Sequence, residues 1–165
     1  MRLRLKHATV NDILEIVNLW QSVNNQLASR LGRPHWTKFL TPQGVYLQMR
    51  KATMYVVREG SVLVAVFTLS MQKPWDMNEI KFNPAARPLY LTDLAIHPFR
   101  HQCGIELLCI REAIKIARRW PSDAIRLDSC DLEFGREVRL EEFGFRTVGT
   151  TRFREIPSVH FELPI

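Results

Sequence analysis

A basic turn that contains glycine separates a predicted strand from a long predicted helix. Residues 91–96 are compatible with a β-strand, and Pro98 ends that strand because proline donates no hydrogen bond to a sheet. The helical pattern begins close to Gly104 and continues through residue 119. The first turn of a helix offers unpaired amides and a positive dipole end, which attract phosphate. This segment therefore predicts a phosphate or pyrophosphate site, with an ordinary strand–turn–helix connection as the alternative.

Two carboxylates, Asp93 and Asp128, fall within otherwise apolar predicted strands. A carboxylate at such a position needs a partner or a function, because burying an unpaired charge is costly. The function that it can perform is proton transfer, and the alternative is a structural ion pair, for example with Arg126 or Arg146. Alternation along the first of these strands predicts two faces: Leu91, Asp93 and Ala95 on one, and Thr92, Leu94 and Ile96 on the other.

The elements that must position these groups follow the order β-α-α-β-β-β-α-β-α-β-β. The predicted strands cover about residues 2–6, 54–57, 62–70, 91–96, 124–129, 146–151 and 158–163. The predicted helices extend from an N-cap at Thr9 to about Arg30, from a second N-cap at Thr41, from about Gly104, and over about residues 135–143. This order predicts an α/β fold with one central mixed β-sheet flanked by helices. The strand at 91–96 and the helix after it are expected at the centre of that sheet, where a ligand would enter.

A length of 165 residues predicts a single domain, residues 1–165, with its own core. No apolar run approaches the ~20 residues that span a bilayer, and the alternating, basic start lacks the apolar centre of a signal peptide. Cys103, Cys109 and Cys130 have no metal-like spacing, so neither a disulfide framework nor a zinc site is expected. A reduced, cytoplasmic setting is therefore predicted.

The net charge of +6 is spread along the chain. A nucleic-acid-binding surface would gather its basic residues and interleave them with aromatic ones, and the sequence shows no such signature. Nucleic acid is therefore a disfavoured partner. Scattered surface charge is the default interpretation, and a polyanionic small molecule is the more specific one.

In the order of its elements, nearly the whole chain resembles the GCN5-related N-acetyltransferase (GNAT) family. The residues similar to the family's central strand and its acyl-CoA pyrophosphate loop are Leu94-Ala-Ile96, Pro98 and Gly104. Gly144-Phe145 is similar to the pair that ends the family's last helix. The chain also resembles a bacterial subgroup of this family whose acceptor is unknown. The similar positions are Leu19-Trp20, residues 32–36, Trp75 and residues 125–128.

The resemblance implies an enzyme that moves an acetyl group from acetyl-CoA to a primary amine of a small molecule or peptide. The amine would attack directly in a ternary complex, without a metal. The acetyl-CoA contacts that the resemblance implies are Leu94, Ala95, Ile96, His101, Gln102, Cys103, Gly104, Ile105, Glu106 and Leu107. The partners are then acetyl-CoA and the amine acceptor, with no membrane; a homodimer is left open.

Physical chemistry supports this placement of acetyl-CoA. Gly104 has no Cβ, so a phosphate can approach its backbone closely. The extended pantetheine arm can add to a splayed strand edge by pairing with the main chain of residues 94–96. Amides beside the acyl carbonyl would stabilise the oxyanion that forms during attack.

The resemblance also suggests which groups act on the acceptor. Asp128 falls where some members have a base carboxylate, so it is the first candidate for the proton acceptor, and Asp93 is the second. His35, Trp36 and Trp75 are expected on loops that frame the acceptor pocket, although loop aromatics often only cover a core.

Three positions depart from the family pattern. His101 stands where the family prefers Arg or Gln, and Glu106 stands where it prefers a small residue. Either the Glu106 side chain points away from the pyrophosphate or it weakens CoA binding. Leu140 replaces the tyrosine that protonates the departing thiolate in many members. These departures support a first alternative, a GNAT-fold CoA-binding module with impaired catalysis; a basic interaction domain for nucleic acid or protein is the second.

Overall fold

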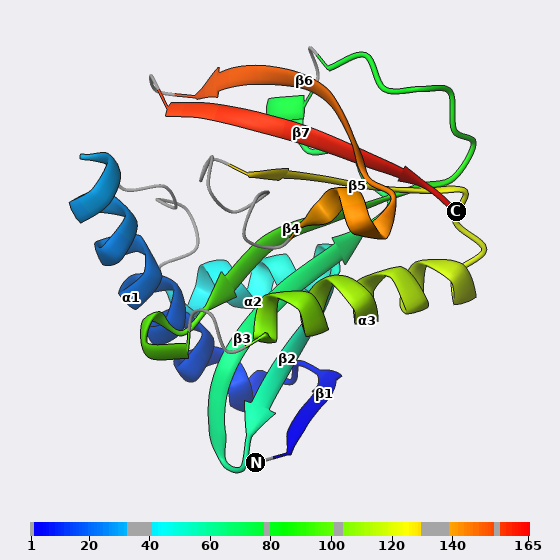
Figure 1. Ribbon diagram of the computed structural model, residues 1–165. Coiled ribbons are helices and arrows are strands. Elements are labelled where there is room, and N and C mark those ends of the chain that lie inside the picture. Colours follow the sequence, from blue (N-terminus) through cyan, green and yellow to red (C-terminus); the bar gives the residue numbers. More distant parts are fainter. Residues whose placement is uncertain (1, 33–40, 78–79, 101–103, 130–138, 154–155) are drawn as a thin grey trace. The chain divides into compact units, whose positions relative to one another are not determined.

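The computed structural model describes residues 2–32, 41–77, 80–100, 104–129, 139–153 and 156–165 (Figure 1). The strands are β1 (Leu3–His7), β2 (Thr53–Glu59), β3 (Val62–Ser70), β4 (Pro88–Ile96), β5 (Ala124–Ser129), β6 (Arg146–Phe153) and β7 (Ile156–Pro164). The α-helices are α1 (Ile13–Leu31), α2 (Pro42–Lys51) and α3 (Ile105–Arg119). Short 3-10 helices are η1 (Val10–Asp12), η2 (Trp75–Met77), η3 (Pro98–Arg100) and η4 (Leu140–Phe143).

The strands form a mixed sheet in the order β1-β2-β3-β4-β5-β7-β6. Strands β4 and β5 pair in parallel, from Pro88 opposite Ala124 to Leu91 opposite Leu127. The pairs β1–β2, β2–β3, β5–β7 and β6–β7 are antiparallel. The predicted mixed sheet with β4 at its centre is therefore confirmed, and β1 lies at one edge of it.

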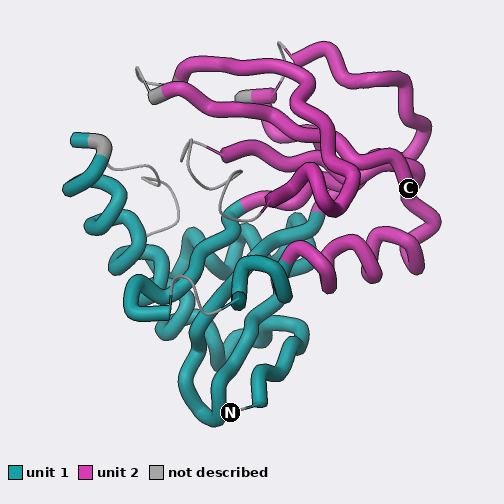
Figure 2. The backbone as a smooth tube through the Cα atoms, viewed as in Figure 1, with its two compact units in different colours: residues 1–69, 93–109 teal, residues 70–92, 110–165 magenta. Residues whose placement is uncertain are grey.

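The chain divides into two compact units, which Figure 2 distinguishes by colour. Unit 1 contains residues 1–69 and 93–109, and unit 2 contains residues 70–92 and 110–165. Strand β4 passes from unit 2 into unit 1 between Thr92 and Asp93. The end of β4, the turn after it and the start of α3 thus belong to the same unit.

The core of unit 1 is built by α1, α2 and strands β2 to β4. Trp20 is fully buried in it, together with Ile16, Val45, Val56, Val66 and Ala95. The predicted end of α1 and the predicted start of α2 are also confirmed. Gly32 ends α1 with a φ of 74°, and the Thr41 hydroxyl oxygen accepts a hydrogen bond from the Gly44 amide ahead of α2. Among the described residues, no helix is both long and apolar enough to cross a bilayer.

A buried carboxylate connects the start of α1 to the sheet. The Thr9 amide donates to Asp12 at 2.8 Å, which is one half of a capping box at the predicted N-cap. Asp12 is only 2% exposed, and Arg58 of β2 donates to it at 2.7 Å. Arg58 also donates to Glu15 at 2.6 Å. Burial alone would raise the pKa of Asp12, but the hydrogen bonds from Arg58 and Thr9 outweigh it and hold that pKa below its ordinary value of 3.8.

The lowered pKa of Asp12 predicts a loss of stability in acid. The folded protein holds this proton more weakly than the unfolded chain, so the contribution is complete above pH 3.8 and disappears as the pH falls through the lower, folded pKa. We expect Asp12→Asn to lower the free energy of unfolding at pH 7 and to flatten its decline below pH 4, measured by urea unfolding across pH. Glu15→Gln is the matched control, because Glu15 shares Arg58 but its side chain is 47% exposed. An equal loss in both variants would contradict the assignment.

One predicted helix differs from the structure. The sequence favoured a helix over about residues 135–143, of which residues 135–138 lie outside the described part of the chain. Arg139 has a left-handed backbone, with a φ of 51°, and only the short η4 follows it. A continuous helix through residue 139 is therefore wrong, because a right-handed helix cannot pass through a left-handed residue. Gly144 ends η4 with a φ of 91°.

Candidate functional site

Strand β4 bends at Asp93, directly after its pairing with β5 ends. Asp93 has a φ of 55°, in the left-handed region that few non-glycine residues occupy. The last β4–β5 pair is Leu91 opposite Leu127. The two faces predicted for this strand depend on a regular pleat, and the left-handed φ of Asp93 interrupts that pleat.

Two helices of unit 1 contact the bend. The indole Nε1–H of Trp20, in α1, donates to the main-chain oxygen of Asp93 at 3.4 Å. The side-chain amide of Gln48, in α2, donates to Asp93 Oδ2 at 3.4 Å. Asp93 therefore has a polar partner at its side chain and another at its main chain.

The turn after β4 leads into the N-terminus of α3. The His97 amide donates to the Val64 oxygen at 2.8 Å, which extends the pairing with β3 past the end of β4. Gly104 has a φ of 74°, and the Leu108 amide donates to its oxygen at 3.1 Å. The amides of residues 105–107 lie ahead of this hydrogen bond, in the first turn of α3, where amides have no acceptor within the helix. His101, Gln102 and Cys103 lie outside the described residues.

The charged side chains near this turn have partners within the protein. The Arg100 guanidinium forms a 2.8 Å ion pair with Glu59 of β2. Glu106 is 8% exposed. Among the described residues, Gly104 and the main-chain amides of residues 105–107 are groups that this part of the chain can offer to an anion.

Asp128 lies near the end of β5, in unit 2. It is half-buried, and the Ser158 hydroxyl of β7 donates to its Oδ2 at 2.9 Å. A structural ion pair, for example with Arg126 or Arg146, was the alternative for this carboxylate. Arg126 instead pairs with Glu162 of β7, with 2.7 Å between Nε and Oε2. Asp128 is thus positioned by a neutral donor and not by this arginine.

The Arg126–Glu162 pair is part of a buried network that sequence reasoning missed. Their side chains are 7% and 3% exposed. Arg126 also donates to the Tyr90 hydroxyl at 2.9 Å and to the Asn83 oxygen at 2.7 Å, and it lies 4.3 Å from the centre of the Phe82 ring. Alternation gave no signal for this pair, because Arg126 and Glu162 alternate with apolar neighbours and so fall on the polar face that the pattern predicts for each strand.

The aromatic residues expected at an acceptor pocket are only partly described. Trp75 is in η2, on the connection from β3 to β4, and is 59% exposed. His35 and Trp36 lie outside the described residues. The structure therefore neither brings these three side chains together nor separates them.

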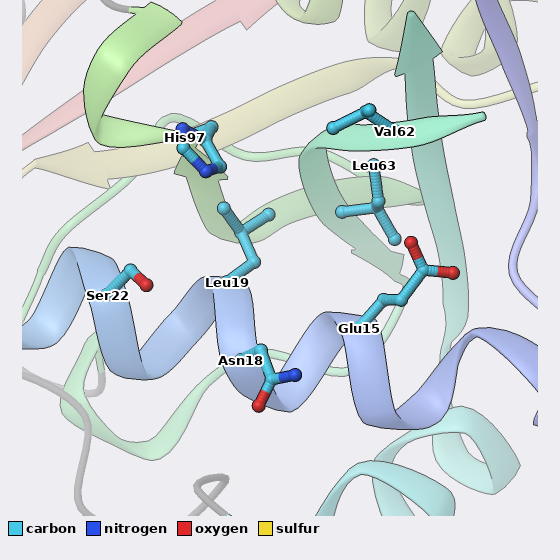
Figure 3. A pocket seen from close by; sticks show the side chains of 7 residues that line it. All are labelled: Glu15, Asn18, Leu19, Ser22, Val62, Leu63 and His97. Atoms are coloured by element: carbon cyan, nitrogen blue, oxygen red, sulfur yellow. The ribbon is translucent and has the colours of Figure 1, made fainter. Parts of the chain in front are cut away.

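A cavity of about 180 Å³ opens in unit 1 beside α1 (Figure 3). Leu19 and Ser22 of α1, Val62 and Leu63 of β3, and His97 line it. It contains no predicted site residue, and it is smaller than the roughly 300–1,000 Å³ of typical small-molecule sites. The His97 Nδ1 accepts a hydrogen bond from the Phe99 amide at 3.3 Å, within the turn that follows β4. The cavity is therefore distinct from the predicted site.

No protein-family model and no curated protein matches the sequence. The structure is nevertheless similar to solved N-acetyltransferases along almost its whole length. A GNAT-family acetyltransferase from Streptococcus agalactiae aligns with a TM-score of 0.77 at 13% identity, over 99% of this chain and 95% of that one. The ribosomal-protein-alanine N-acetyltransferase from Brucella melitensis aligns with a TM-score of 0.73 at 14% identity, over 98% and 99% of the two chains.

The chain has the GNAT fold. A third similar structure is a putative acetyltransferase from Salmonella typhimurium with its cofactor acetyl-CoA; it has a TM-score of 0.70 at 14% identity, over 98% of this chain and 93% of that one. The fold implied by the sequence resemblance is thereby confirmed. Within that fold, unit 1 contains residues 93–96 and the described part of the predicted loop, and unit 2 contains Asp128.

Proposed function

We propose that the protein is an acetyl-CoA-dependent N-acetyltransferase that acts on a primary amine. The main support is the end of β4, where pairing with β5 stops at Leu91 and a bend follows at Asp93. A strand that leaves its partner exposes main-chain groups to which an extended, amide-containing arm can add. The GNAT fold adds support to this proposal, because one of the similar structures contains acetyl-CoA.

In this proposal, acetyl-CoA extends from β4 to the start of α3. The pantetheine arm pairs with the main chain of Leu94, Ala95 and Ile96. The pyrophosphate is received by the turn at residues 101–104 and by the amides of Ile105, Glu106 and Leu107 at the positive end of α3.

Asp128 is the proposed proton acceptor. The amine nitrogen attacks the thioester carbonyl, a C–N bond forms, the C–S bond breaks, and CoA leaves as a thiolate. Asp128, directly or through a water molecule, takes the proton that the amine loses. The hydrogen bond from Ser158 orients the carboxylate. His35, Trp36 and Trp75 are proposed to surround the acceptor.

The departing thiolate has no tyrosine donor at the usual position. Leu140 occupies that position, is fully buried in η4, and has no acidic proton. Water is therefore the proposed proton source for CoA, and turnover is expected to be slow.

The first test is whether the purified protein binds CoA and acetylates an amine. Native mass spectrometry should show a mass increase for bound CoA. A panel of amino acids, polyamines and peptides with a free N-terminus should then identify the acceptor by release of free CoA. Binding without turnover on any amine would favour the CoA-binding module. A salt-dependent gel shift with random duplex, without CoA binding, would favour the interaction domain.

Substitution of Gly104 should weaken CoA binding. Apart from its neighbours in the chain, a Cβ at Gly104 meets no atom of the described residues within 4 Å, but it would occupy the space that a phosphate needs, at a φ of 74°. We expect Gly104→Val to raise the Kd for CoA at least about tenfold, about 1.4 kcal/mol, by calorimetry.

Gly60→Val is the matched control for this prediction. Gly60 lies in the β2–β3 turn and has a φ of 62°, and a Cβ added there would also meet no atom within 4 Å. It should therefore show a similar backbone strain without the loss of affinity. Equal affinities for CoA in two folded variants would contradict the placement of the phosphate at Gly104.

A further inference from the structure

We infer that Asp93 shapes strand β4 and does not accept the proton, and that Gln48 and Trp20 are the positioning residues that hold it. This inference rests on the proposed function, because it concerns how acetyl-CoA is aligned. It assigns a role to two helices, α1 and α2, that the predicted site did not include.

The backbone at Asp93 is the first reason. A φ of 55° disfavours most side chains, because Cβ approaches the following carbonyl oxygen. Aspartate and asparagine tolerate this region better than other non-glycine residues, because their short polar side chains find local hydrogen bonds. The residue type at position 93 therefore suits the bend itself, apart from any role for the charge.

The contacts of Asp93 are the second reason. The Gln48 amide donates to the carboxylate, and the Trp20 indole donates to the main-chain oxygen, each at 3.4 Å. Trp20 is fully buried in the core of unit 1, so its position is set by packing. Val45, one turn before Gln48 in α2, is also fully buried and fixes the helix that presents the amide. The bend is thus attached to two helices through two different oxygen atoms.

The position of the bend explains what this attachment does. Pairing with β5 ends at Leu91, and residues 94–96 are the ones proposed to pair with the pantetheine arm. The torsion angles at Asp93 set the direction of those main-chain groups relative to the paired part of the same strand. A change in these angles would therefore act on acetyl-CoA binding more than on proton removal.

Three substitutions at one position separate shape from charge. Asp93→Asn keeps an oxygen for Gln48 and the tolerance for positive φ, but removes the basic carboxylate. Asp93→Gly keeps only the tolerance for positive φ. Asp93→Ala keeps neither this tolerance nor the oxygen for Gln48. We expect the KM for acetyl-CoA to rise least in Asp93→Asn and most in Asp93→Ala, where the rise is about tenfold. The kcat of Asp93→Asn should fall by no more than about threefold. The pH dependence of kcat should be the same in the Asp93→Asn variant as in the parent protein.

A double-mutant cycle tests the contact with Gln48. Gln48→Leu should raise the KM for acetyl-CoA in the parent protein, and should add little in the Asp93→Gly background, where no carboxylate remains to be held. Circular dichroism and melting temperature identify any variant that does not fold. If the Asp93→Asn variant does not fold, the Asp93→Gly variant takes its place in the comparison, because glycine also lacks the carboxylate and tolerates the bend.

The outcomes distinguish this inference from the proposed function. A fall of about 100-fold in kcat for Asp93→Asn, with a changed pH profile, would make Asp93 the base and overturn the inference while the acetyltransferase remains. Additive effects of Gln48→Leu and Asp93→Gly would also overturn it. A parent protein that binds no CoA would refute the proposed function. The inference would then be decided by the melting temperatures of the three variants. A melting temperature that falls in the order Asp93→Asn, Asp93→Gly, Asp93→Ala would support it. Equal melting temperatures for Asp93→Ala and Asp93→Asn would overturn it.

Discussion

Asp128→Asn is expected to lower kcat by roughly 10²-fold or more, with the affinity for CoA little changed. The substitution preserves the shape of the side chain and an oxygen that can accept the hydrogen bond from Ser158. It removes the group that takes the proton from the amine. The measurement is kcat for the best acceptor across pH, together with CoA binding by calorimetry.

Ser158→Ala is the companion variant. It leaves the Asp128 carboxylate in place and removes only the donor that orients it, so its loss of kcat should be smaller than that of Asp128→Asn. If Asp128 were only structural, its substitution would lower the melting temperature while turnover per folded molecule persisted. Full activity in folded Asp128→Asn would reject this base and leave a water chain as the proton acceptor.

Breaking the buried Arg126–Glu162 pair is expected to cost the most stability. Arg126→Met would leave the Glu162 carboxylate, whose side chain is 3% exposed, without its cation. Removing one partner of a buried pair typically costs about 3–5 kcal/mol, because an uncompensated charge remains. The measurement is the free energy of unfolding in urea at pH 7.

Two further variants isolate the cause of that loss. Arg126→Met with Glu162→Leu removes both charges and should recover much of the stability, since burying an ion pair requires its desolvation. Lys115→Met removes one member of the Lys115–Glu112 pair on α3, whose side chains are 52% and 24% exposed, and should cost no more than about 1 kcal/mol. A double variant less stable than Arg126→Met would show that packing, and not the unpaired charge, dominates.

Local patterns predicted most of the elements correctly, because they depend on neighbours in the chain. Apolar alternation predicted a strand at residues 124–129, where β5 lies. Thr41 and Pro42 predicted the start of α2, since a cap and a proline favour a helix N-terminus wherever they occur. Gly104 and Pro98 likewise predicted the turn between β4 and α3. Short-range sterics and hydrogen bonds are sufficient for these decisions.

The conformation of Asp93 and the partners of the buried charges depended on contacts distant in sequence. Nothing within residues 91–96 requires a left-handed residue, and the donors to Asp93 come from Trp20 and Gln48, which are far from it in the chain. Arg126 likewise pairs with Glu162, 36 residues away, and not with Asp128, two residues away on the same strand. In a sheet, the neighbour on the next strand is closer to a side chain than most of its neighbours in sequence, and only the assembled sheet determines which residue that neighbour is.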